Sequence, residues 1–198
     1  MTRKLPSYLT EEEVNQILGS VDRENGKFAF RNRLMIEVMF WGGLRVSENA
    51  NLDVGDIEFD RGCLNLRNTK GGKSRTVPLK RELLSRLKQY INSTRAGKAK
   101  YLRDDPVFLS ASGKRLTTRR IEQVVKKHAD LLDIGKRITP HTFRHSFAVN
   151  CAKHDIPGKY IQDMLGHEDF GTTEIYLKHH LSLDEMRKQY EKLEGVKE

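Results

Sequence analysis

The sequence predicts one α+β domain that is mostly α-helical and carries a small antiparallel β-sheet. Three observations predict this fold class. They are an amphipathic helix near the N-terminus, a second helix that is apolar nearly all round, and an alternating segment followed by a turn and a further extended segment. With 198 residues, of which 37% are hydrophobic, the chain is long enough to bury a sizeable core.

Two helices are expected near the N-terminus. The sequence Thr10-Glu-Glu-Glu13 is a capping box, in which each end residue's side chain accepts a hydrogen bond from the other's backbone N–H. The apolar residues that follow lie on one stripe: Val14, Ile17, Leu18 and Val21. The second helix, about residues 28–41, is apolar on nearly every side, so we expect it to be the central buried helix. Gly42-Gly43 ends it.

A β-hairpin is expected next. Residues 56–68 have the character of an extended segment, in which Cys63-Leu-Asn-Leu66 alternates, and Val77 and Leu79 follow the turn. Helices then fit the remaining apolar patterns, at residues 80–94, 118–132, 140–153, 159–165 and 184–193. His128, in the second of these, is expected at the surface.

The turn of the hairpin contains Gly71-Gly72-Lys73-Ser74, which is similar to the end of a nucleotide-binding phosphate loop. That motif needs a glycine five residues before Gly72, where this chain has Arg67, and it needs a helix afterwards. The segment that follows, residues 75–79, contains a β-branched pair and a proline and favours a strand. The sequence therefore excludes a phosphate loop and predicts a hairpin tipped with lysine.

The positive charge of the chain is concentrated in its middle. The formal net charge is +9, yet residues 61–120 hold 17 Lys and Arg against 3 Asp and Glu. Such a concentration is typical of a protein that binds a polyanion. No run approaches the roughly 18 apolar residues of a membrane span, and the N-terminus has no apolar signal segment, so we expect a cytoplasmic protein without membrane contact. Cys63 and Cys151 are expected to be two buried thiols.

Residues able to act on a phosphate occur at four places. Gly43-Leu-Arg-Val-Ser-Glu48 follows the buried helix, so Arg45 is held close to the core and can be aimed at an anion. The hairpin supplies Lys70 and Lys73. The segment Thr139-Pro-His-Thr-Phe-Arg-His145 begins a helix that carries His141 and Arg144 on one face. The last is Leu165-Gly-His167, followed by Thr172-Thr-Glu-Ile-Tyr176.

A zinc site is the first alternative for these histidines. His141 and His145 lie four residues apart on a helix, and His167 or a later histidine could add a third ligand. The metalloprotease motif, however, needs glutamate after the first histidine, where this chain has Thr142, and Arg144 in the same turn repels a cation. We therefore expect no metal and no other cofactor. A site that stabilises phosphoryl transfer without a metal must use arginine, histidine and lysine.

Taken in order, the motifs GLRVSE, KGGKSRTVPL, HTFRHSFA, LGH and TTEIY resemble the catalytic domain of the tyrosine recombinase (phage integrase) family, especially its Xer-like members. The resemblance runs from Leu5 to the last predicted helix. Each motif alone is weak, but five in the right order, with Tyr176 nine residues after His167, are specific. The resemblance implies the tyrosine recombinase catalytic-domain fold of DNA breaking-rejoining enzymes.

The resemblance also implies a role for each residue. Tyr176 would attack a DNA phosphodiester, forming a 3′-phosphotyrosyl intermediate and releasing a 5′-hydroxyl. Arg45 and Arg144 would hold the non-bridging oxygens. His141 would assist proton transfer at the tyrosine.

The three remaining roles belong to His167, a lysine of the hairpin and Glu48. His167 would donate to a phosphate oxygen. Lys70 would be the general acid for the leaving 5′ oxygen, with Lys73 as the alternative. Glu48 would orient neighbouring side chains, and its simpler interpretation is a carboxylate at the start of a helix.

The function implied is site-specific recombination or integration of double-stranded DNA, without metal or ATP, by a homo-oligomer that is a tetramer on DNA. We expect residues 1–198 to form one catalytic domain. Residues 1–8 would be an extension or linker remnant, and residues 183–194 a C-terminal helix that neighbouring copies can exchange. The core-binding domain that usually precedes the catalytic domain is expected to be absent. The alternatives are a DNA-binding or regulatory protein of the same fold without cleavage activity, and a DNA relaxer similar to type IB topoisomerases.

Two positions depart from the family pattern. Asn49 stands where an apolar residue is usual, and Leu177-Lys178 replaces a small polar residue and a histidine. Neither change removes a residue to which the resemblance assigns catalysis.

Overall fold

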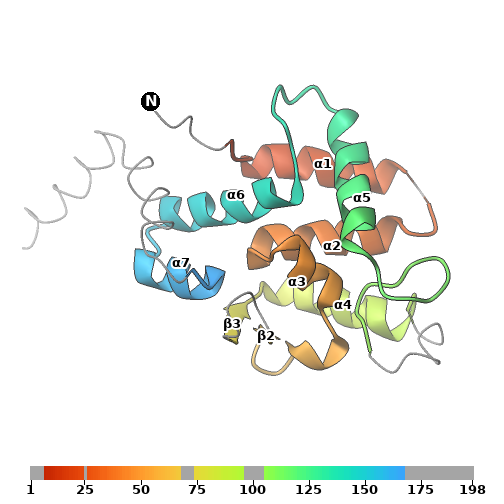
Figure 1. The fold of residues 1–198 in the computed structure, drawn as a ribbon, viewed down its shortest axis with the longest axis horizontal. Helices are drawn as coiled ribbons and strands as arrows, with labels where there is room; N and C mark the ends of the chain where they lie inside the picture. The colour runs from red at the N-terminus through yellow and green to blue at the C-terminus, as the bar shows by residue number, and fades with distance from the viewer. Residues whose placement is uncertain (1–6, 25, 68–73, 96–104, 168–198) are drawn as a thin grey trace, which may run out of the picture. The chain divides into compact units, whose positions relative to one another are not determined.

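The structure is a computed structural model that describes residues 7–24, 26–67, 74–95 and 105–167 (Figure 1). The chain divides into two compact units, Met1–Phe147 and Ala148–Glu198. The first unit holds α1 (Glu11–Arg23), α2 (Ala29–Gly42), α3 (Val46–Asn51), the short 3₁₀ turn η1 (Val54–Asp56), β1 (Ile57–Glu58), β2 (Cys63–Leu66), β3 (Arg75–Pro78), α4 (Arg81–Asn92) and α5 (Thr118–Asp130). Helix α6 (Pro140–Lys153) begins in the first unit and ends in the second, which also holds α7 (Gly158–Leu165).

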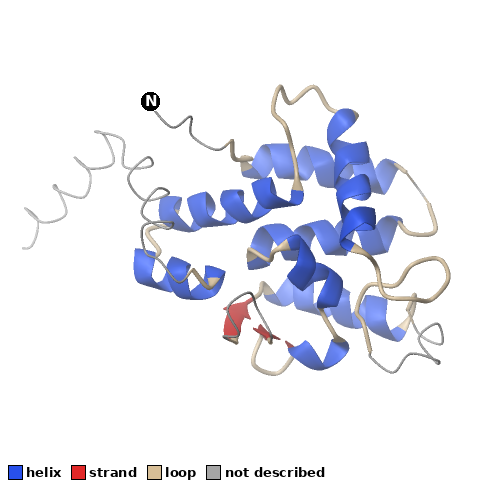
Figure 2. Cartoon of the chain, in the orientation of Figure 1, coloured by secondary structure: helices blue, strands red, loops and turns tan. Residues whose placement is uncertain are grey.

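The predicted fold class is confirmed, because helices dominate and the strands form one antiparallel three-stranded sheet in the order β1-β2-β3 (Figure 2). The predicted helices are found with their ends within two residues, except that residues 184–193 lie outside the described part of the chain. Among the described residues, no helix is both long and apolar enough to cross a membrane. Cys63 and Cys151 are free and buried, as predicted.

The first two helices form as their sequences predict. Thr10 N donates to Glu13 Oε2 (2.8 Å) and Glu13 N donates to Thr10 Oγ1 (3.2 Å), so the capping box is confirmed. The apolar stripe of α1 is buried against α2 and α5. Helix α2 is the central helix and contacts α1, α3, α4 and α5, which explains why it is apolar on nearly every side (Figure 1).

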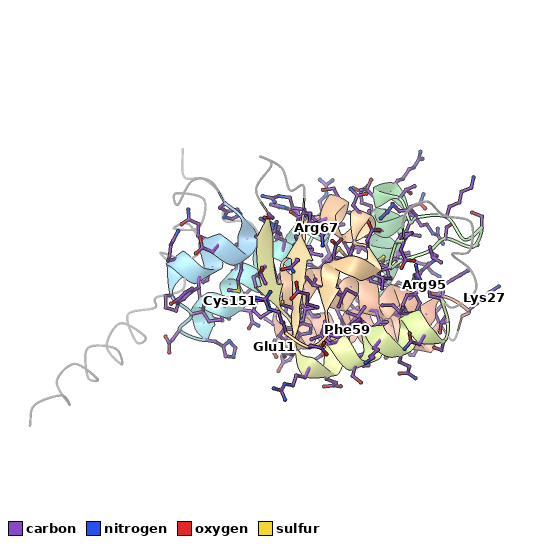
Figure 3. All side chains as sticks on the ribbon, turned by 90° about the horizontal axis from the view of Figure 1, so that it is seen from below. Glu11, Lys27, Phe59, Arg67, Arg95 and Cys151 are labelled. Carbon is purple, nitrogen blue, oxygen red and sulfur yellow. The ribbon has the colours of Figure 1, made fainter. Side chains whose placement is uncertain are left out.

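The prediction of one extended segment at residues 56–68 is wrong. A tight turn divides it into β1 and β2, and Gly62 takes a left-handed conformation (φ +73°) that favours glycine. Phe59 lies in this turn, and Arg67 directly follows β2, where it pairs with Asp56 at 3.5 Å (Figure 3). The sequence does carry a signal for this turn, Asp60-Arg-Gly62, because aspartate and glycine favour turns over strands.

The register of β2 and β3 sets the direction of the β3 side chains. Leu64 pairs with Val77 and Leu66 pairs with Arg75. Side chains alternate along a strand, so Arg75 and Val77 point to the same face. Val77 is fully buried and the Arg75 side chain is only 6% exposed, so this face is the inner one. An arginine is thereby directed into the protein from the start of β3.

Gly43 allows α2 to end close against α6. It caps α2 in a left-handed conformation (φ +60°), and a Cβ atom there would lie 2.5 Å from the Phe147 ring. Both the backbone angle and the contact exclude other residues. This close approach places the Gly43 carbonyl, and Arg45 shortly after it, beside the first turns of α6.

His128 is buried, so its predicted place at the surface is wrong. Its side chain is 1% exposed between α1 and α5, with Nδ1 3.1 Å from Ser20 Oγ and Nε2 3.1 Å from Glu24 Oε2. Burial lowers the pKa of His128 and the charge of Glu24 opposes that shift. Because the partners come from a helix more than 100 residues away, the local sequence around His128 does not indicate this contact.

Asn49→Leu is expected to stabilise the protein. Asn49 is fully buried in α3; its Nδ2 donates to the Met35 carbonyl (3.0 Å), but no described residue donates to its Oδ1. A buried acceptor without a donor costs about 1–3 kcal/mol, and leucine keeps the branched shape of asparagine while its larger methyl groups need no hydrogen-bond partner. We expect the free energy of unfolding in urea to rise by about 1 kcal/mol. A lower free energy of unfolding for Asn49→Leu than for the wild type would mean that the hydrogen bond to the Met35 carbonyl stabilises the protein by more than the unpaired Oδ1 costs.

Candidate active site

A buried glutamate, Glu48, lies at the centre of the candidate site. It is the third residue of α3, and its Oε2 accepts a hydrogen bond from the backbone N–H of Arg45, the residue that caps the helix (2.7 Å). Its Oε1 accepts from Arg45 Nη1 (2.8 Å). Glu48 therefore begins the helix and holds the Arg45 guanidinium, which confirms both interpretations that the sequence offered.

A second arginine binds the same carboxylate from the sheet. Arg75 Nη1 donates to Glu48 Oε1 and Arg75 Nη2 donates to Oε2, both at 2.7 Å. The two side chains are only 6% and 8% exposed. Paired, parallel hydrogen bonds of this kind fix the plane of a carboxylate as well as its position. The pair thus joins β3 to α3.

A third arginine, Arg144, reaches the group from α6. Its side chain is 5% exposed, its Nη1 donates to the Gly43 carbonyl (2.6 Å), and the same atom lies 3.9 Å from Glu48 Oε2. The Gly43 carbonyl at the end of α2 therefore holds Arg144, and Arg45 follows Gly43 by only two residues. Arg45 and Arg144 come from segments about 100 residues apart and meet around one carboxylate.

The charges of this group shift two pKa values. Burial by itself raises the pKa of Glu48, but hydrogen bonds and charge from Arg75 and hydrogen bonds from Arg45 outweigh it and lower the pKa to about 2. His141 lies on the first turn of α6. Partial burial, followed by the positive charges of Arg144 and Arg45, lowers the pKa of His141. At neutral pH Glu48 is therefore charged, and His141 is neutral and able to accept a proton.

Glu48 is expected to make the folded protein sensitive to acid. Its pKa falls from 4.5 to about 2 on folding, so the folded state favours the charged form more than the unfolded chain does. This stabilisation is complete above about pH 4.5 and is lost as the pH falls toward 2. By pH 3 the loss should be about 2 kcal/mol.

The measurement is the free energy of unfolding of the wild type and of Glu48→Gln, by urea denaturation at several pH values between 6 and 3. The gap between the two profiles should narrow as the pH falls. Parallel profiles would show that Glu48 is not the group responsible.

His167 lies in the second unit, at the end of α7. Gly166 caps α7 in a left-handed conformation (φ +63°). His167 N donates to the Gln162 carbonyl (3.2 Å), and Gln162 Nε2 donates back to the His167 carbonyl (3.1 Å). The LGH motif is thus a helix end whose glycine turns the chain and whose histidine has a fixed backbone.

Three of the six predicted catalytic residues, Arg45, His141 and Arg144, come together in the first unit. His167 is described in the second unit by itself. Lys70, the alternative Lys73, and Tyr176 lie outside the described residues. Within the described ranges, no group of three or more His, Cys, Asp and Glu side chains stands together as a metal site would require.

Arg75 is not among the site residues that the sequence predicted. Its signal in the sequence is the alternation of β3, which directs Arg75 to the same face as Val77. An arginine that points into the protein needs a buried acidic partner, and this requirement indicates a contact such as the one with Glu48.

The chain is similar to known proteins over most of its length. Residues 7–182 match the phage integrase family. The chain is 35% identical over 190 residues to the tyrosine recombinase XerD of Staphylococcus epidermidis, covering 95% of this chain and 62% of that protein. It is 34% identical over 181 residues to the tyrosine recombinase XerA of Pyrococcus furiosus, covering 89% and 58%. The chain thus spans about three fifths of the length of these relatives.

Solved structures show the same fold. A crystal structure of XerA recombinase superposes with a TM-score of 0.78 at 28% identity, covering 96% of this chain and 65% of that one. XerH site-specific recombinase bound to its difH substrate gives 0.78 at 27% identity, covering 96% and 55%. The catalytic domain of bacteriophage HP1 integrase gives 0.65 at 21% identity, covering 98% and 100%, which is a likeness of fold. The fold is that of a tyrosine recombinase catalytic domain, and the chain belongs to the phage integrase family.

Proposed function

We propose that this chain is the catalytic part of a site-specific DNA recombinase or integrase, which cleaves and rejoins DNA through a 3′-phosphotyrosyl intermediate without metal, ATP or another cofactor. The observation that carries the proposal is the pair of arginines, half-buried Arg45 and buried Arg144, held around Glu48 next to a neutral His141. Guanidinium groups aimed from fixed positions are suited to the non-bridging oxygens of a phosphodiester.

The proposed chemistry combines these arginines with the residues that the family resemblance assigns. The phenol oxygen of Tyr176 attacks phosphorus while its proton passes to a base, a role that suits neutral His141. The bond from phosphorus to the 5′ oxygen breaks, and Lys70 protonates the leaving oxygen, with Lys73 as the alternative. Arg45, Arg144 and His167 stabilise the charge that develops on the phosphate oxygens. Attack by a 5′-hydroxyl on the phosphotyrosine reverses the reaction and releases the tyrosine.

Double-stranded DNA is the proposed partner. Several arginines of the basic segment 61–120 form ion pairs within this protein, mostly with acids that lie outside that segment; these are Arg61, Arg67, Arg75, Arg86, Arg95 and Arg115. Exposed cations remain on α4, on α5 and near them: Lys80, Arg81, Lys88, Lys114, Arg119 and Arg120. These can supply the salt-dependent contacts to DNA phosphates.

The proposal includes three further points of organisation. Residues 1–198 form one catalytic domain, the protein acts as a tetramer on DNA, and residues 183–194 form a helix that neighbouring copies can exchange. XerH, a relative at 27% identity, is known bound to its substrate difH. We also expect a cytoplasmic location.

The proposal is tested by trapping the covalent intermediate. A pool of nicked suicide duplexes of random sequence is incubated with the protein in EDTA, and a denaturing gel is read for a protein–DNA band. The nick lets the cleaved fragment diffuse away, so that rejoining cannot erase the adduct. A band supports the tyrosine mechanism. Salt-sensitive DNA binding without a band, over the whole pool, would favour the alternative of a DNA-binding protein that does not cleave.

A strand-transfer assay beside a plasmid-relaxation assay of the same protein separates recombination from simple relaxation. A relaxer changes only the linking number of a supercoiled plasmid, whereas a recombinase joins strands from two duplexes. Transfer of a labelled strand to an unlabelled acceptor supports recombination, and relaxation without any strand transfer favours the topoisomerase-like alternative.

A further inference from the structure

We propose that Arg75 is a positioning residue of this active site, which acts through Glu48 to hold Arg45 and Arg144 in the arrangement that binds phosphate. This inference rests on the function proposed above for Arg45 and Arg144. It concerns a residue to which the motif comparison assigns no role. Arg75 differs from the two phosphate-binding arginines because it reaches the site from the sheet.

The backbone of Arg75 is held in place by the sheet. It opposes Leu66 in the β2–β3 ladder, and the inward direction of its side chain is set by the alternation that also buries Val77. Its guanidinium is only 6% exposed. Arg75 therefore presents its two N–H groups to Glu48 from a rigid support.

The carboxylate of Glu48 transmits this rigidity. Oε1 accepts from Arg45 Nη1 and Arg75 Nη1, and Oε2 accepts from Arg45 N and Arg75 Nη2, all at 2.7–2.8 Å. Oε2 also lies 3.9 Å from Arg144 Nη1. Without the Arg75 fork, the carboxylate plane is free to rotate toward Arg144, and the bond that orients the Arg45 guanidinium is weakened. Both guanidinium groups then lose the fixed carboxylate that sets the distance between them.

Lysine cannot replace this contact fully. An ammonium group is a single compact donor, whereas the guanidinium binds both carboxylate oxygens in one plane. The position along the chain adds a second consequence. Arg75 follows Lys73 by two residues and Lys70 by five, so the same ion pair ties β3, which begins shortly after both lysines in the sequence, to the two arginines.

A purely structural ion pair elsewhere in the fold provides a matched control. Arg86 of α4 binds both oxygens of the buried Glu37 of α2, at 2.9 and 2.5 Å. Arg86→Ala breaks a bidentate arginine–glutamate pair, as Arg75→Ala does, but that pair joins α4 to α2 and not β3 to α3. Loss of stability alone should therefore be shared by the two variants, and an effect on the active site should not.

The experiment compares wild type, Arg75→Ala, Arg75→Lys and Arg86→Ala by two readouts. The first is the pKa of His141, from an NMR titration of the free protein, which reports the field of Arg144 and Arg45 without any DNA. The second is the single-turnover rate of adduct formation on the nicked suicide duplexes that the wild type selects from the random pool. DNA affinity is measured on the same duplexes.

We expect Arg75→Ala to slow adduct formation about 10- to 100-fold while DNA affinity changes less than about 3-fold, because the loss falls on the transition state. The pKa of His141 should rise by about 0.5, as the positive charges near it lose their fixed places. Arg75→Lys should recover part of both effects, and Arg86→Ala should stay within about 2-fold of the wild type.

A double-mutant cycle tests whether Arg75 acts through Glu48. In a Glu48→Gln background, Arg75→Ala should slow adduct formation less than about 2-fold further and leave the His141 titration nearly unchanged. Fully additive effects would overturn the proposal. So would a folded Arg75→Ala variant that matches Arg86→Ala in both readouts. If Arg75→Ala does not fold, Arg75→Lys carries the same comparisons.

The two readouts separate this inference from the proposed function. If the wild type forms no adduct on any duplex of the pool, the proposed function fails, yet the His141 titration still decides whether Arg75 positions the two arginines. If the wild type forms the adduct and the Arg75 variants leave both readouts unchanged, the function stands and the role of Arg75 is refuted.

Discussion

Tyr176→Phe is expected to bind DNA with the affinity of the wild type and to form no covalent adduct. Phenylalanine keeps the ring and removes only the oxygen that would bond to phosphorus, so ground-state binding is preserved and the intermediate cannot form. The measurement is adduct yield on nicked suicide duplexes in a denaturing gel, beside a filter-binding or gel-shift titration of the same duplexes. The adduct should fall by at least about 10³-fold, to the detection limit.

Tyr160→Phe is the matched control for this variant. Tyr160 lies on α7 and is 62% exposed, so it is accessible but has no assigned role. It should retain the wild-type yield. If Tyr176→Phe still forms an adduct that Tyr160→Phe lacks, the nucleophile is reassigned. If both variants keep it, the phosphotyrosine assignment to either residue is wrong.

Arg144→Ala is expected to lose chemistry far more than binding. The guanidinium is 5% exposed and fixed by the Gly43 carbonyl, so it meets the phosphate without reorganisation. Loss of one such preorganised donor lowers the rate of cleavage by about 10²- to 10³-fold. DNA affinity, which exposed cations supply in large part, should change less than about 3-fold. The rate of single-turnover adduct formation measures the cleavage step, and a binding titration measures the DNA affinity.

Arg31→Ala controls for the removal of a buried arginine. Arg31 is 3% exposed and its Nη1 donates to the Leu109 carbonyl at 2.6 Å, as Arg144 Nη1 does to Gly43. Its loss should lower stability and leave the cleavage rate of the folded protein within about 2-fold. A loss of rate in Arg144→Ala that merely follows its loss of affinity would contradict a catalytic role.

The sequence alone was sufficient for the fold class and for most of the candidate site. Capping boxes, apolar stripes and strand alternation involve residues a few positions apart, so α1, α2 and the later described helices are visible as patterns. The order of five short motifs likewise predicted the family. It selected Arg45, His141 and Arg144, which the structure brings together, and it named Tyr176, Lys70 and His167, whose roles are proposed.

The tertiary structure decided what depends on contacts distant in the sequence. The buried place of His128 depends on Ser20 and Glu24, 108 and 104 residues away. Arg75 reaches Glu48 across 27 residues, and Arg144 reaches Gly43 across 101. A buried charge is stable only where an opposite charge or a polar group meets it, and packing selects that partner from the whole chain. For this reason the sequence identified the arginines, and only the fold showed that Glu48 brings three of them together.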